Sequence, residues 1–164
     1  MKFAVRQVVA VPPARAMAAY GSPAFYEGRP GRDDIEVRGV LRHEATADRV
    51  LLEVRFAITG SLSAAVRAVV DPAKLSWVTR TELVAAESRS SWVVLPDHYP
   101  DRLRAAGSYR FGEGDGGPGS TVVEVEGDLS VRVALVGRSV ERVIVNDLRA
   151  YIADEAAGIE AWDG

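Results

Sequence analysis

The sequence predicts a single α+β domain, spanning residues 1–164, in which an antiparallel sheet packs against one long C-terminal helix. Apolar and polar residues alternate over 128–136, which is the period of a half-buried strand. From Val140 to Trp162, after a turn at 137–139, the apolar residues recur every three or four positions, as on one face of a helix. At about 1.5 Å of rise per residue, such a helix can cross a whole sheet.

The N-terminal third predicts a strand followed by two short helices. Residues 2–11 alternate, and the proline pair at 12–13 ends that strand. Residues 14–20 predict a short helix with a proline in its first turn. A second short helix is expected after Ser22, whose side chain can cap the first turn.

Further alternating segments predict the strands in the middle of the chain. These segments are 35–45, 49–59, 75–86, 88–95, 103–111 and 121–125. The glycine-rich residues 112–119 carry two acids and lack the Gly-Lys-Ser/Thr ending of a phosphate loop, so they predict an exposed hairpin tip.

Residues 60–72 do not alternate. Leu62, Val66 and Val69 predict one apolar side of a short helix, serving either as a lid over an interior space or as a packed connector.

Composition excludes several classes of function. The chain has 164 residues, a net charge of −3 and no cysteine, which rules out disulfides and thiolate catalysis. No segment interleaves basic and aromatic residues, so nucleic acid is not expected as a partner. No run approaches the roughly 20 apolar residues that span a bilayer. A cytoplasmic protein without metal or cofactor, and without stable membrane insertion, is expected.

Several segments resemble a known superfamily. They are Met1–Phe3, Ser22–Phe25 and Gly127–Gly137, with the block Val131–Glu141 carrying most of the weight. Together with the order of elements, they resemble the START-like superfamily of lipid-transfer domains and polyketide cyclases, and within it an actinobacterial family of unknown function. The resemblance implies a helix-grip fold, in which about seven antiparallel strands wrap around the last helix and leave a cavity. It implies no catalytic residue.

An enclosed apolar space indicates a small hydrophobic ligand, either lipid-like or polycyclic. A cavity on the order of 300–1,000 Å³ is expected between the helix and the sheet. Its predicted apolar lining is Phe25, Phe56, Trp77, Val133, Ile144 and Leu148. Two alternatives stay open: a cyclase- or dehydratase-type enzyme acting on a polyketide-like substrate, and a packed interaction domain without ligand. Binding is favoured over catalysis because few polar groups are placed in the interior.

Glu155 is the most unusual residue of the predicted helix. It falls near the middle of the apolar face, where a carboxylate is costly to bury unless it is paired. It can serve as a polar anchor for a ligand or as an acid or base. A structural pair with an arginine of the sheet, such as Arg6 or Arg38, is the favoured interpretation.

Other polar residues have simpler interpretations. Glu141 and Ser139 are expected to stabilise the start of the helix, Ser139 as its cap. His43 shares a predicted face with apolar residues at one end of the cavity, and His98 lies in a turn beside Asp97. Neither histidine is expected to bind metal, since no set of convergent ligands accompanies it.

Overall fold

A computed structural model describes the whole chain except residues 29–31, 33, 61–66, 68–70, 116 and 135. The strands are β1 (Lys2–Val9), β2 (Ile35–Ala45), β3 (Arg49–Ile58), β4 (Ser76–Val84), β5 (Arg89–Pro96), β6 (Leu103–Gly114) and β7 (Gly117–Val131). The α-helices are α1 (Pro13–Tyr20), α2 (Pro23–Gly28) and α4 (Gly137–Ala161), and two 3-10 turns, η1 (Pro72–Lys74) and η2 (Ala85–Glu87), flank β4.

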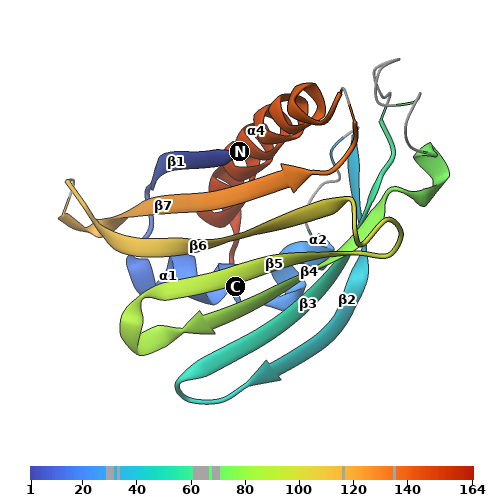
Figure 1. The fold of residues 1–164 in the computed structure, drawn as a ribbon. Coiled ribbons are helices and arrows are strands. Elements are labelled where there is room, and N and C mark those ends of the chain that lie inside the picture. Colours follow the sequence, from blue (N-terminus) through green and yellow to red (C-terminus); the bar gives the residue numbers. More distant parts are fainter. Residues whose placement is uncertain (29–31, 33, 61–66, 68–70, 116, 135) are drawn as a thin grey trace.

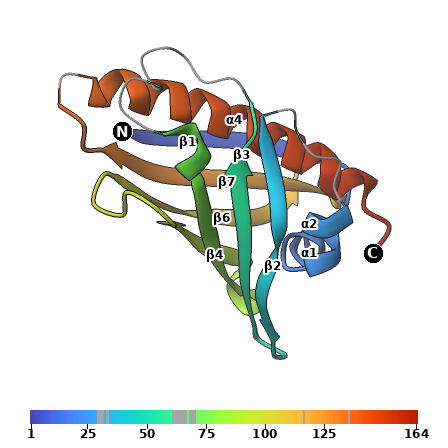
Figure 2. The same cartoon turned by 90° about the vertical axis from the view of Figure 1, so that its right-hand side faces the viewer.

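The strands form one antiparallel sheet in the order β1-β7-β6-β5-β4-β3-β2. The sheet curves, and α4 lies along β1 and β7, while α1 and α2 lie near the C-terminal end of α4 (Figures 1 and 2). This arrangement confirms the predicted α+β class, the seven strands, the long last helix and the two short helices after the first strand.

The last strand differs from the prediction. Residues 121–125 and 128–136 were expected as two strands, but β7 is continuous and ends at Val131. Val133 lies beyond it, and α4 begins at Gly137 rather than Val140. A Cβ built on Gly137 would lie 2.6 Å from the Val131 carbonyl oxygen, so the chain reverses too sharply there for the strand to continue.

Two smaller expectations are also corrected. Ser139 does not cap α4, because Val136 occupies the cap position and no side chain bonds there. The loop expected at 112–119 is shorter, since β6 runs to Gly114 and β7 starts at Gly117. The φ of +89° at Gly117 is one that a glycine adopts readily. Leu62, Val66 and Val69, which predicted a short helix, lie outside the described residues.

Two glycines in the middle of the sheet allow large rings to meet above it. Gly107 of β6 pairs with Gly127 of β7, and their outer neighbours in this row are Trp92 and Phe3. The two rings approach with centroids 6.3 Å apart. A Cβ built on Gly127 would lie 2.5 Å from the Phe3 ring, so the space above both glycines is already occupied.

Replacing Gly107 by alanine is expected to lower the free energy of unfolding by more than about 3 kcal/mol, because overpacking displaces both rings and backbone. The new Cβ would lie 2.0 Å from the Glu126 carbonyl oxygen and 2.6 Å from the Trp92 ring. Gly112→Ala is the matched control, since nothing lies within 4 Å of its Cβ position. Urea unfolding of both variants measures the difference, and equal stabilities would show that the row does not restrict residue size.

Candidate functional site

The inward face of α4 changes character along its length. Ile144, Leu148 and Tyr151 are only half-buried although they pack against the core, whereas Val140 and Val145 of the N-terminal half are buried. Ile152, the residue after Tyr151, is 4% exposed, and Ile159 near the end is 1% exposed. The C-terminal end of the helix is therefore closed by packing, while the side that carries Ile144, Leu148 and Tyr151 leaves apolar surface incompletely covered.

Aromatic rings from β3 and β4 stand opposite this half-covered region. Phe56 is buried between Trp77, on which it stacks at 5.7 Å, and Tyr151, which it meets edge-on at 6.0 Å. Trp77 is half-buried, and its Nε1 donates a hydrogen bond to Thr79 Oγ1 at 3.2 Å.

A buried polar group lies beneath the C-terminal half of α4. Tyr109 of β6 donates a hydrogen bond from its hydroxyl to Glu155 Oε2 at 2.8 Å, and Glu155 is 3% exposed. The ring of Tyr20, from α1, packs on Tyr109 with centroids 4.5 Å apart. Burial and the Glu155 carboxylate raise the pKa of both tyrosines well above their ordinary value. Both phenols thus stay protonated at neutral pH and act as hydrogen-bond donors.

Two hydroxyl side chains of the sheet complete this polar group. Thr81 is 4% exposed and Ser90 is 1% exposed, and the nearby hydroxyls of these two residues counteract part of the rise in the pKa of Tyr20 that burial causes. Ser90 sits directly opposite Tyr109 in the ladder between β5 and β6. Sequence reasoning did not single out these residues, although their inward places in alternating strands were a usable signal.

The arginine partners expected for Glu155 are wrong. Arg6 lies 3.6 Å from Asp115, and Arg38 lies 3.0 Å from Glu36. Both arginines are about half exposed, so they belong to the surface of the domain rather than to the interior. The interaction that the structure gives for Glu155 is instead the phenol of Tyr109.

A charged bridge ties the segment before β2 to α4. Arg32 donates hydrogen bonds to Asp34, at 2.7 and 3.1 Å, and to Asp154 of the helix. These bonds lower the pKa of Asp34. Partial burial and the Asp34 carboxylate raise the pKa of Asp147, which lies two turns before Asp154. The bridge positions the entry to β2 beside the half-covered face of α4.

The remaining predicted residues lie in different places. Phe25 is 2% exposed and packs edge-on against Tyr26 at 5.2 Å. Val133 is half-buried and lies beyond β7, in a recess with Arg102 and Arg132. Of the other predicted lining residues, Phe56 and Trp77 stack on each other, and Ile144 and Leu148 are half-buried on α4.

The other polar candidates have structural surroundings. Glu141 accepts a hydrogen bond from the Val131 amide at 2.9 Å and lies 3.8 Å from the N-terminal ammonium, which supports its predicted role at the start of the helix. His43 is exposed and does not line an interior, because the β2–β3 hairpin extends beyond the body of the sheet (Figure 1). His98 is exposed as well, while Asp97 is held by Arg55 and Ser76.

Two recesses bounded by described residues lie outside the space between α4 and the sheet. One, of about 530 Å³, is on the outer face of the sheet around Arg89, Arg110 and Glu124. The other, of about 290 Å³, is the one that holds Val133. The enclosed cavity between helix and sheet therefore stays a prediction.

Neither a metal cluster nor a membrane span is found within the described residues. No three histidine, aspartate or glutamate side chains there are grouped to hold an ion. No described helix is long and apolar enough to cross a membrane.

The curved seven-stranded sheet around a long terminal helix is the helix-grip fold. Residues 4–162 match the family described as "Protein of unknown function (DUF2505)", and the chain belongs to this family. No curated protein sequence matches the chain.

Solved structures share the fold at low sequence identity. TTHA0849 from Thermus thermophilus is 13% identical with a TM-score of 0.63, over 98% of this chain and 95% of that one. The Zhui aromatase/cyclase from a Streptomyces species is 14% identical with a TM-score of 0.63, over 97% and 91%. A START superfamily protein from Mycobacterium smegmatis is 16% identical with a TM-score of 0.58, over 98% and 94%. At these identities the similarity establishes the fold alone.

Removing the Tyr109 hydroxyl that donates a hydrogen bond to Glu155 is expected to destabilise the protein. Tyr109→Phe should lower the free energy of unfolding by about 1–3 kcal/mol at neutral pH, because a buried carboxylate loses a donor. Tyr99→Phe is the control, since the Tyr99 hydroxyl accepts only a long bond of 3.4 Å at the surface. A double-mutant cycle with Glu155→Gln measures the coupling, and additive losses would show that the two groups do not stabilise one another.

The Arg32 bridge is expected to give a pH-dependent contribution. The folded-state pKa of Asp34 lies below the ordinary 3.8, so this stabilisation is complete above 3.8 and disappears as the pH falls through the lowered value. Arg32→Gln should cost about 0.5–1 kcal/mol near pH 7, since the pair is partly screened by solvent, and progressively less as the pH falls below 3.8. Unfolding curves of Arg32→Gln and of Arg38→Gln, the exposed control pair, measure this. A cost independent of pH would contradict it.

Proposed function

We propose that this protein binds a small hydrophobic ligand between the N-terminal half of α4 and strands β3 and β4. The observation that carries the proposal is the half-buried face of α4 at Ile144, Leu148 and Tyr151, opposite the half-buried ring of Trp77. Covering such a surface lowers the free energy by about 25 cal/mol per Å² of apolar area removed from water, which favours an apolar ligand.

The side chains around this face favour a ligand with a flat apolar body and one polar end. Phe56 and Trp77 stack with an interplanar angle of 17°, and a planar ring system extends such a stack more readily than a branched chain does. The Tyr109–Glu155 pair lies about one helical turn beyond Tyr151, and its carboxylate and phenol oxygens can accept hydrogen bonds. A polycyclic molecule with a hydroxyl group fits this distribution better than a simple hydrocarbon.

The structural relatives are consistent with the proposal, but they do not identify the ligand. One is titled an aromatase/cyclase and another a START superfamily protein. The fold hosts different activities, so the ligand has to be inferred from this chain's own side chains. The proposed place of binding is the cytoplasm, and no nucleic-acid partner is proposed.

A catalytic role is the second candidate, and the Tyr109–Glu155 pair is the observation that favours it. A protonated phenol can donate a hydrogen bond to a substrate oxygen while the carboxylate accepts a proton from a neighbouring carbon or hydroxyl. In a binding protein, Glu155→Gln would weaken ligand binding. In an enzyme, it would lower turnover by about a hundredfold or more and leave binding largely intact.

Binding is tested with N-phenyl-1-naphthylamine, an uncharged fluorescent probe of apolar sites. Leu148→Glu should lower its affinity by at least about tenfold, because a charge replaces apolar lining. Val143→Glu is the matched control, since Val143 is 43% exposed on another side of the same helix. Circular dichroism confirms that both variants fold.

Mass spectrometry of organic extracts from the natively purified protein identifies a ligand that co-purifies with it. Absence of probe binding to the wild type, or equal losses in Leu148→Glu and Val143→Glu, would overturn the proposal.

A further inference from the structure

We propose that a basic recess at the start of α4 binds a phosphate group. The recess, of about 290 Å³, is lined by Arg102, Arg132, Val133 and Ala134. The Arg132 amide donates a hydrogen bond to the Arg102 carbonyl oxygen at 2.7 Å, which fixes the two arginines as neighbours. This site shares no residue with the proposed apolar site, so it can be confirmed or rejected independently of the proposed function.

The turn before β6 holds Arg102 in place. Its guanidinium lies over the Tyr99 ring at 5.3 Å from the centroid, and its amide donates to the Tyr99 carbonyl oxygen at 2.9 Å. Tyr99 itself has a φ of +58°, which is uncommon for a residue other than glycine. A guanidinium already ordered by stacking loses less entropy when it binds an anion.

The arginines at this corner differ from others in their ion pairing. Among the described residues, Arg102, Arg132 and Arg138 form no ion pair within 4 Å, although arginines elsewhere do, such as Arg80 with Glu53 at 2.7 Å. A bound anion would supply the missing negative charge.

Three acids lie close to the recess along the chain. Asp128 and Glu141 both approach the N-terminal ammonium, at 3.3 and 3.8 Å, and Glu141 also accepts the Val131 amide. Asp101 precedes Arg102 and is exposed. None of the three is paired with a recess arginine within the described part of the chain, so the local charge stays positive.

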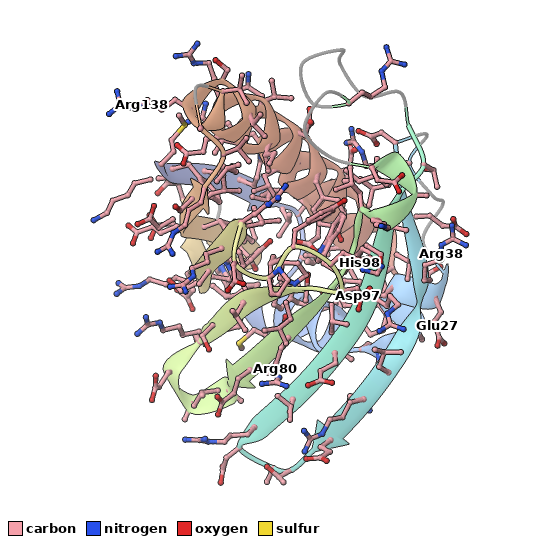
Figure 3. The ribbon with its side chains drawn as sticks, turned by 45° about the vertical axis from the view of Figure 1, so that its right-hand side comes forward. Glu27, Arg38, Arg80, Asp97, His98 and Arg138 are labelled. Atoms are coloured by element: carbon pink, nitrogen blue, oxygen red, sulfur yellow. The ribbon has the colours of Figure 1, made fainter. Side chains whose placement is uncertain are left out.

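The beginning of α4 adds to this positive charge. No side chain caps the helix and its first turn contains no acid, and Glu141 in the next turn is already bonded to the Val131 amide. Arg138 lies in that first turn, and Figure 3 shows it pointing away from the ribbon at the start of α4. Two arginines beside a helix start match the several oxygens of a phosphate group better than a single carboxylate.

The phosphate group can come from two sources, a phospholipid headgroup or a soluble phosphate ester. The connections β3–β4, β5–β6 and β7–α4 all leave the sheet at the same end, because the strands alternate in direction. Arg132, Val133 and Ala134 of the basic recess belong to the end of this last connection, which leads into the start of α4 (Figure 2).

The test compares two pairs of arginines that differ only in surroundings. Arg102→Gln/Arg132→Gln removes the recess cations. Arg89→Gln/Arg110→Gln is the control, since these two are exposed, face each other across β5 and β6, and form no ion pair among the described residues. Their own recess also contains Glu87, Glu113, Asp115 and Glu124, which repel an anion. Both double variants change the net charge equally.

Each protein is titrated with inorganic phosphate at constant ionic strength, followed by amide NMR shifts, and is floated with phosphatidylcholine vesicles with and without phosphatidylglycerol. Binding to either probe that the recess variant weakens by at least about tenfold, and the control does not, supports the proposal. Vesicle binding alone identifies a lipid headgroup, and phosphate binding alone identifies a soluble ester. No binding to either probe, or equal losses in both variants, overturns it.

Discussion

The paired glycines at the centre of the sheet are the constraint on which the other elements depend. Gly107 and Gly127 leave room for Trp92 and Phe3 to meet above them, so four neighbouring strands must keep one register. Because side chains alternate between faces, a slip by one residue would turn these rings outward. The same register puts Ser90 opposite Tyr109, and thereby builds the polar group that faces α4.

The interior is divided into a closed end and a half-covered end. At the closed end, α1 places Tyr20 on Tyr109, and Glu155 completes a group of buried polar side chains. At the other end, Trp77 and Leu148 keep part of their surface uncovered. A fully packed core has little room for a ligand, whereas a core left incomplete at one end can bind one without losing its fold.

Charge is distributed differently on the surface and inside. On the outer face, cross-strand pairs such as Arg49–Glu82 and Arg80–Glu53 are exposed and contribute little stability each. Glu155 is buried, so its partner matters much more to the free energy of folding. The corner at Arg102 differs from both, because its cations form no ion pair with an acid among the described residues.

Periodicity alone determined the order of elements, since alternation and helical spacing follow from which face of each element is buried. It also placed Glu155 correctly on the inward face of the last helix. It failed at the end of β7, because apolar and polar residues keep alternating to Val136 although strand pairing stops at Val131. Only the tertiary structure decided that Tyr109 donates to Glu155 while Arg6 and Arg38 pair at the surface, and that Val133 lies in a recess beyond β7. Such partners are set by strand order and register, which join residues far apart in the sequence and leave no local pattern to read.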